Sequence, residues 1–417
     1  MKKTHPILIL LSLMAIALAI SCAATPPPAS VAPTEEASPP PATTTPPVAP
    51  PPAPPPLSPE DAFKAQTGMT PAEYYAQKEK ELNAAREAAI NAGAEQLAPE
   101  YLWDADGVGL DALAKWEAKD YFAAKDAAED ALAAYVALKD GLEAYKLREE
   151  IAADAGRLFP EYLSVADNVG LDALEKWDAK DYSGAKDGAA EALVMYTALK
   201  DGLAAYMIRE EIAAKAERLV PEYLFEADSV GLDALDKWDA GDYTGAKDAV
   251  ADALVMYSAL KAGIRAYEVR EEIAGSAGTS TLFLQADSIS LDALDKWDSK
   301  DYSGAKAAAE TALAMYLNVA ASGERQKALD YRADVAVRQG FSSADAIYSR
   351  AIAEYRGQRY EEAAKLFDES WAMFKVAAQE ALEKRQAAEE ALRRSDQRLT
   401  ESDETARQAE LILEGGR

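Results

Sequence analysis

The stretch Leu-Asp-Ala-Leu-Asp-Lys-Trp-Asp-Ala-Gly-Asp-Tyr-Thr-Gly-Ala-Lys, residues 232–247, decides the fold, because close copies of it occur at regular intervals along the chain. The shared pattern is Leu-Asp-Ala-Leu-x-Lys-Trp-x-x-x-Asp-Tyr-x-x-Ala-Lys. Self-similarity at a fixed period indicates a repeat architecture, in which each unit packs mainly on its neighbours. The tryptophans of the four copies are 61, 61 and 59 residues apart: Trp116, Trp177, Trp238 and Trp297.

Two further blocks recur in step with the first. Tyr-x-x-Arg-Glu-Glu-Ile-Ala begins at Tyr145, Tyr206 and Tyr267, and Pro-Glu-Tyr-Leu begins at Pro99, Pro160 and Pro221. Together these blocks divide the chain into four predicted repeats: residues 99–159, 160–220, 221–280 and 281–341.

Each repeat has the apolar spacing of α-helices. Proline at the start of three units suits the first turn of a helix, where its missing N–H costs nothing. Glycine at Gly241 predicts a break, after which an aspartate caps the next helix through its carboxylate. In the third repeat the first expected apolar face comprises Leu224, Ala227, Val230, Gly231, Ala234, Leu235 and Trp238. The second comprises Tyr243, Ala246, Val250, Ala253, Tyr257, Leu260, Ile264 and Tyr267. The expected caps are Asp120, Asp181, Asp242 and Asp301.

These patterns predict an all-α fold, an array of antiparallel helical hairpins (an α-solenoid) with a period of about 60 residues. Gly263 leaves open whether the second part of each repeat is one long helix or two shorter ones. The recurrent aromatic residues could form a carbohydrate-binding strip, but their helical spacing beside Ala and Leu favours a place in the core. The tyrosines in this set are Tyr121, Tyr182, Tyr243, Tyr302 and Tyr360.

The break followed by Asp-Tyr and spaced small residues, as at residues 241–254, resembles the second helix of a tetratricopeptide repeat. Residues 355–367 resemble it more closely, and residues 342–376 are therefore interpreted as a degenerate hairpin of this kind. The period near 60 departs from the 34 residues of that family. The resemblance implies a binding scaffold made of helical hairpins.

The flanks of the array have simpler patterns. Residues 61–98 are expected to form an N-terminal capping helix. Residues 377–417 are rich in Glu, Arg and Gln and predict a charged C-terminal helix, either a polar cap or a coiled-coil arm.

The N-terminus has the pattern of an export signal. Two lysines precede an uncharged, mostly apolar run from Ile7 to Ile20, which is too short to span a bilayer. Residues 1–21 are therefore predicted to be a signal peptide. The run ends in Leu-Ala-Ile-Ser-Cys, which resembles the lipobox of bacterial lipoproteins. The resemblance implies lipidation of Cys22, and Ala23 after it favours the outer over the inner membrane. An ordinary secretory cleavage near Ala23 or Ala24 is the alternative.

Beyond the cysteine, residues 22–60 are dominated by Pro, Ala and Thr. Such a composition cannot bury enough apolar surface to fold, so this segment is predicted to be a disordered linker behind the lipid anchor.

The residue types of the chain exclude several kinds of chemistry. His5, the single histidine, lies in the predicted signal peptide, and Cys22 is the single cysteine. Histidine-dependent catalysis, cysteine nucleophiles and ordinary zinc sites are therefore not expected, and no cofactor is predicted. The segment 104–115 starts like an EF-hand loop, but Val108 and Lys115 stand where oxygen ligands are needed.

The net charge of −28 disfavours nucleic acid as a partner. Three functions remain. The favoured hypothesis is a non-enzymatic, membrane-anchored envelope lipoprotein whose repeats bind other envelope proteins. A second is a structural component that links or spaces the membrane and peptidoglycan. The least favoured is a cell-wall hydrolase using carboxylates.

Overall fold

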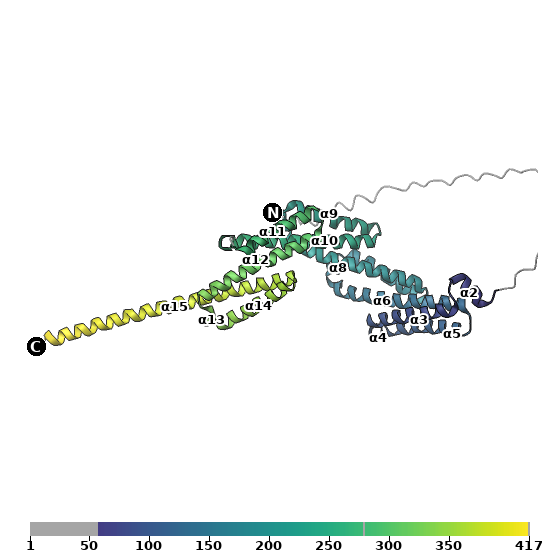
Figure 1. Ribbon diagram of the computed structural model, residues 1–417, viewed down its shortest axis with the longest axis horizontal. Helices are drawn as coiled ribbons and strands as arrows, with labels where there is room; N and C mark the ends of the chain where they lie inside the picture. The colour runs from purple at the N-terminus through teal and green to yellow at the C-terminus, as the bar shows by residue number, and fades with distance from the viewer. Residues whose placement is uncertain (1–56, 278–279, 416–417) are drawn as a thin grey trace, which may run out of the picture. The chain divides into compact units, whose positions relative to one another are not determined.

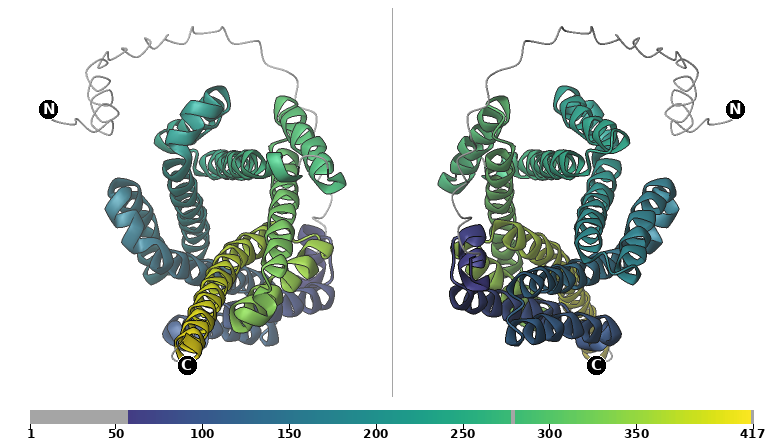
Figure 2. Two further views of the ribbon diagram at one scale, coloured as in Figure 1. Left: turned by 90° about the vertical axis from the view of Figure 1, so that its left-hand side faces the viewer. Right: turned by 90° about the vertical axis from the view of Figure 1, so that its right-hand side faces the viewer.

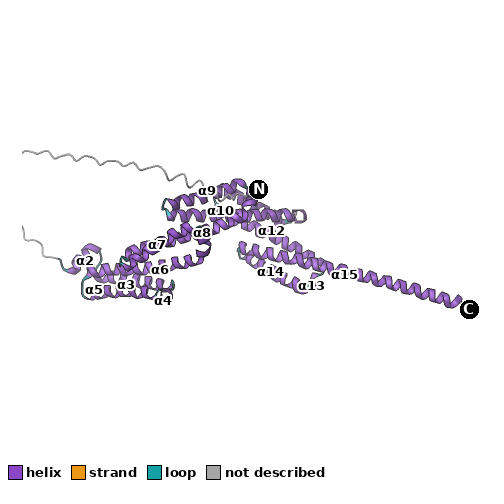
Figure 3. Cartoon of the chain, turned by 180° about the vertical axis from the view of Figure 1, so that it is seen from behind, coloured by secondary structure: helices purple, strands orange, loops and turns teal. Residues whose placement is uncertain are grey.

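A computed structural model of the chain describes residues 57–277 and 280–415. Every regular element in these ranges is a helix, and none is a strand (Figures 1 and 3). The all-α prediction is thus confirmed. The predicted signal peptide, Cys22 and most of the linker fall on residues 1–56, outside the described part of the chain.

The helices alternate between short and long members that pair as hairpins. Each short helix packs along the long helix that follows it. Each long helix is continuous, so the question left open by Gly263 is answered in favour of a single helix. The pairs are α5 (Pro99–Glu117) with α6 (Tyr121–Leu158), α7 (Pro160–Asp178) with α8 (Tyr182–Leu219), α9 (Pro221–Asp239) with α10 (Tyr243–Ala277), α11 (Thr281–Asp298) with α12 (Tyr302–Asp330), and α14 (Arg338–Arg356) with α15 (Tyr360–Gly415).

The turn inside each of the first four hairpins is set by the predicted aspartate. In three hairpins its carboxylate accepts the backbone N–H three residues later at 2.9 Å, at Asp181, Asp242 and Asp301. At Asp120 the same bond is 3.4 Å long. The residue before each cap has a positive φ, which Gly241 adopts without strain and which lysine occupies in the other three turns. The caps predicted from the sequence are confirmed.

The long helices pack on one another in chain order: α6 on α8, α8 on α10, α10 on α12, and α12 on α15. Each short helix lies beside its own long helix (Figure 2). The buried clusters therefore extend across successive hairpins. One of them joins Ile151 of α6, Leu163 of α7, Met195 of α8 and Trp238 of α9.

The ends of the array differ from the expected boundaries. Instead of one capping helix there are three, because Gly68 and Gly93 adopt positive φ and end the helical runs. These are α2 (Pro59–Thr67), α3 (Pro71–Asn91) and α4 (Ala94–Leu97). The first of them begins inside the segment predicted as linker.

At the other end, a one-turn helix α13 (Ala333–Ala336) precedes α14, which begins at Arg338 rather than at residue 342. The expected charged C-terminal helix is the continuation of α15. Its first part packs on α12 and α14, and its residues 383–411 are exposed.

Two residues expected on buried faces are accessible. Leu235 is 37% exposed and Tyr267 is 49% exposed. The apolar stripe of α9 is wider than the surface that its neighbours cover, and the residues around Tyr267 leave about half of its side chain uncovered. The prediction of burial was wrong at both positions.

Candidate functional site

The recurrent tryptophans lie at the junctions between hairpins. Trp177, Trp238 and Trp297 are buried, whereas Trp116 at the start of the array is partly buried. Each ring lies edge-on or tilted to the tyrosine five residues later, with centroids 5.2–5.3 Å apart. In the last hairpin Tyr355 and Tyr360 form the corresponding pair at 5.4 Å. Of the tyrosines in these pairs, Tyr121 and Tyr182 are buried, and Tyr243, Tyr302 and Tyr360 are partly buried.

A tyrosine from the preceding short helix completes the aromatic groups of Trp177, Trp238 and Trp297. The ring centroid of Tyr101 is 5.4 Å from that of Trp177, and the distance from Tyr223 to Trp297 is 5.3 Å. Tyr162 and Trp238 make the same contact at 5.6 Å. These packed aromatic pairs fix the junctions, and most of their area is unavailable to a ligand.

An acid on the preceding short helix holds two of these groups. Glu226 of α9 accepts hydrogen bonds from the Trp297 indole N–H and the Tyr302 hydroxyl, each at 2.7 Å. Asp104 of α5 accepts the equivalent pair from Trp177 and Tyr182, at 3.0 and 3.1 Å. Burial and this bond raise the pKa of Tyr182, and likewise of Tyr302, to about 12. The corresponding residue of α7 is Val165, so the junction at Trp238 lacks this acid clamp.

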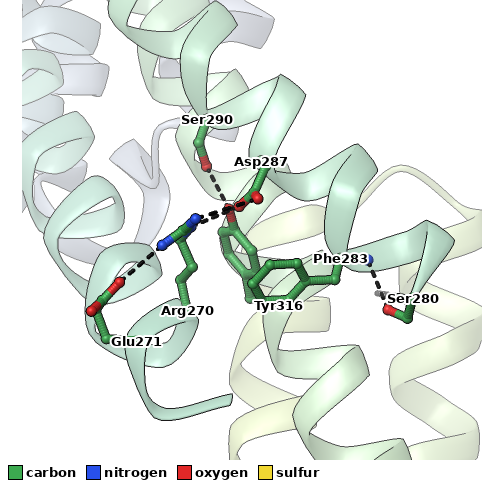
Figure 4. A network of polar contacts seen from close by, with 7 residues as sticks. All are labelled: Arg270, Glu271, Ser280, Phe283, Asp287, Ser290 and Tyr316. Carbon is green, nitrogen blue, oxygen red and sulfur yellow. Dashed lines mark hydrogen bonds and ion pairs between the residues drawn. The ribbon is translucent and has the colours of Figure 1, made fainter. Parts of the chain in front are cut away.

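A second polar network recurs inside the array. An arginine on one helix pairs with an aspartate on the next short helix, and a tyrosine on the following long helix donates its O–H to the same carboxylate. Figure 4 shows the copy formed by Arg270, Asp287 and Tyr316, with bond lengths of 2.7 Å from the guanidinium Nε and 2.5 Å from the phenol. The other copies are Arg86–Asp106–Tyr135, Arg148–Asp167–Tyr196 and Arg209–Asp228–Tyr257.

The electrostatics of this network are those of a structural ion pair. Burial alone would raise the pKa of Asp287, but the hydrogen bonds from Arg270 and Tyr316 lower it below its usual value. Burial, together with the bond to Asp287, raises the pKa of Tyr316 to about 12. Both groups therefore keep one protonation state near neutral pH and are poorly placed to exchange protons in catalysis.

The accessible apolar surface also repeats. Each of the four short helices α5, α7, α9 and α11 carries a leucine that is 52–66% exposed at the start of its Leu-Asp-Ala-Leu motif, and a second, partly exposed leucine three residues later. The second set includes Leu235 and Leu294. On three of these helices a further exposed apolar residue, Trp103, Phe225 or Leu284, lies two turns before the first leucine, on the same face. We call the first set the short-helix leucines: Leu110, Leu171, Leu232 and Leu291.

Two crevices of about 360 Å³ each lie between packed helices. One lies between α3, α5 and α6, with Tyr75, Trp116 and Tyr135 in its walls. The other, which we call the α10–α12 crevice, lies between α10, α11 and α12 and is closed at one side by the start of α9. Its walls are almost entirely apolar, which is typical of ligand sites at the small end of their size range.

Sequence reasoning missed the Arg–Asp–Tyr networks and the accessible leucines. Arg148, Arg209 and Arg270 lie in the recurring Arg-Glu-Glu-Ile-Ala block, and three of the four aspartates recur seven residues after the proline of Pro-Glu-Tyr-Leu. This common register was a usable signal. The leucines lie in the most regular motif of the chain, but their exposure depends on which neighbours cover them.

The described residues contain no group of three or more side chains placed to hold a metal ion. No helix in residues 57–277 and 280–415 has the length and apolar character needed to cross a bilayer. Comparison of the chain with protein-family models, with characterised proteins and with solved structures finds no match.

Proposed function

We propose that the chain is a lipid-anchored envelope protein whose helical repeats, an α-solenoid of tetratricopeptide-like hairpins, act as a non-enzymatic scaffold for other proteins. The observation that carries the proposal is the regular exposure of the short-helix leucines. Packing within the chain does not explain why one apolar side chain in each repeat is more than half exposed. Exposed apolar patches that recur in this way mark interaction surfaces.

The repetition favours a multivalent mode of binding. A partner that contacts one short helix gains little affinity. After a first contact, each further contact with another short helix is intramolecular, so a partner that contacts several helices binds more tightly. Each of these helices also carries more acidic than basic residues. On α9 there are six acids and one lysine. Charge complementarity therefore favours partners with basic and apolar surface.

The proposed anchor is Cys22, and the proline-rich residues after it would serve as the tether. Two or more acyl chains anchor a protein stably, whereas one chain holds it only marginally. The outer membrane is the favoured location. A structural link to peptidoglycan is the second candidate, because the exposed continuation of α15 provides a charged arm.

In-cell crosslinking followed by purification tests the proposal. We expect a defined set of proteins to copurify with the wild-type chain. The recovered amount of these proteins should fall at least tenfold with the combined variant L110S/L171S/L232S/L291S. This variant removes exposed side chains and leaves the core intact. Recovery of no partner, or equal recovery with the variant, would overturn the scaffold function. Cosedimentation with isolated peptidoglycan tests the second candidate, and a purified chain that stays in the supernatant refutes it.

A further inference from the structure

The α10–α12 crevice combines apolar walls with one polar end. Leu260 and Ile264 of α10, Trp297 of α11 and Ala309 of α12 line its walls. The polar end is the network of Figure 4, in which Arg270, Ser290 and Tyr316 border the crevice. The Ser290 hydroxyl lies 3.4 Å from the Tyr316 hydroxyl, and glycine occupies the position of Ser290 in the three preceding repeats.

Two residues that line the crevice are smaller than their equivalents in the preceding hairpin. The preceding hairpin has Phe159 and Val250 at the positions that Val220 and Ala309 occupy here. Phe159 packs on Tyr206 with ring centroids 5.6 Å apart, and Val220 cannot make this contact with Tyr267. Both differences reduce the volume of residues that line the crevice.

The space beside two glycines at equivalent positions, Gly202 and Gly263, differs in the same way. A Cβ atom added to Gly202 would lie 3.5 Å from a methyl group of Val250, in ordinary contact. A Cβ atom added to Gly263 would have no neighbour within 4 Å. Space that is filled between α8 and α10 is therefore empty between α10 and α12.

The surface around the opening of the α10–α12 crevice is apolar and acidic. Tyr267 and Leu294 are both nearly half exposed, and the short-helix leucine Leu291 lies one turn from Leu294. The short helices α9 and α11 carry exposed carboxylates that have no salt-bridge partner within the described part of the chain. They are Glu222, Asp236, Asp239, Asp295 and Asp298.

The exposed part of α15 and residues 1–56 offer no bulky aromatic side chain to the crevice. The exposed part of α15, residues 383–411, has arginines but no Phe, Trp or Tyr. Residues 1–56 contain none of these aromatics either. A bulky aromatic side chain that fills the crevice must come from a partner.

We infer that the α10–α12 crevice is the anchor site for one Trp or Tyr side chain of a partner segment rich in lysine and arginine. This inference rests on the proposed scaffold function and gives it a specific site. The ring contacts the apolar walls, and the Ser290 hydroxyl accepts a hydrogen bond from the indole N–H or the phenol. The basic residues of the segment lie against the acids of α9 and α11. Anchoring by one aromatic residue in a pocket is typical of interfaces whose affinity depends on few side chains.

The test compares two fluorescein-labelled, amidated peptides, each with three lysines on both sides of a central residue. That residue is tryptophan in one peptide and alanine in the other. Fluorescence polarisation with the purified full chain should show the tryptophan peptide binding at least about tenfold more tightly, a difference of about 1.4 kcal/mol. G263L fills the empty space and should reduce the ratio to about one. G323L is the matched control, because Gly323 is an exposed helical glycine of α12 with open space around it.

A second variant guards against misfolding. V220F/A309V restores the residues of the preceding hairpin and should also abolish the advantage of tryptophan, with an unchanged circular dichroism spectrum. Equal affinity of both peptides for the wild-type chain would overturn the inference, and so would a ratio that persists in V220F/A309V. If either outcome is found while the cellular crosslinks still depend on the short-helix leucines, the anchor site in the crevice is refuted and the scaffold function stands.

Discussion

Replacement of Glu226 by valine tests how the hairpins are joined. The Glu226 carboxylate accepts the Trp297 N–H and the Tyr302 O–H at 2.7 Å each, and Trp297 is only 4% exposed. Hydrogen bonds to a charged group contribute about 1.5–3 kcal/mol each, and a buried donor left without a partner costs about 1–3 kcal/mol. Tyr302 is partly exposed and recovers part of its loss by bonding water. We therefore expect E226V to lower the free energy of unfolding by about 2–4 kcal/mol.

The chain contains its own control for this prediction. Val165 occupies the equivalent position at the preceding junction, so E226V copies an arrangement that the array already tolerates. V165E should have the opposite effect and stabilise by about 1 kcal/mol, because it brings an acceptor to the Trp238 indole. E222A, which removes an exposed acid from the same helix, should change stability by less than about 0.5 kcal/mol.

Urea unfolding followed by circular dichroism measures the global effect. Amide hydrogen exchange locates it, because units of a repeat array depend mainly on their neighbours and protection should fall most in α11 and α12. If E226V and E222A are indistinguishable in both measurements, the clamp does not join the hairpins and the reasoning is refuted.

Three further predictions follow from the caps, the tyrosines and the anchor. D242A should destabilise by about 1 kcal/mol and D120A by less, because the Asp120 cap bond is longer; equal effects in urea unfolding would contradict this. The raised pKa of Tyr316 contributes stability that is present below about pH 10 and is lost as the pH rises through about 12. Between these values the free energy of unfolding of the wild-type chain should fall by about 1.4 kcal/mol per pH unit more than that of Y316F. Parallel pH profiles would refute the role of this phenol. C22A should abolish labelling by radioactive palmitate and release the chain from the membrane fraction, whereas A24S should do neither; a C22A chain that stays in the membrane fraction would refute the anchor.

Local features of the fold were predictable because they depend on residues close in sequence. The aspartate caps, the break at Gly241 and the apolar periodicity each involve fewer than two helical turns. The Arg148–Asp167–Tyr196 network joins residues 19 and 29 positions apart, and it forms only because α6, α7 and α8 meet at that point.

The site was less predictable because accessibility is a property of packing. Periodicity predicted that Leu235 lies on a buried face. The prediction failed because the sequence of an apolar stripe does not show how much of its width a neighbouring helix covers. The α10–α12 crevice is lined by Val220 and Ala309, which are smaller apolar residues than their equivalents Phe159 and Val250. Both residues look like ordinary core positions until α9, α10 and α12 are brought together.

The central claim is that partners contact the short helices, and a photo-crosslinker placed at single positions in living cells tests it most directly. Leu232 on α9 and Leu399 on the exposed part of α15 are both exposed leucines, 52% and 62%, and so form a matched pair. The account predicts a discrete crosslinked protein from position 232 and none from position 399. Crosslinks from position 399 with none from position 232 would contradict it.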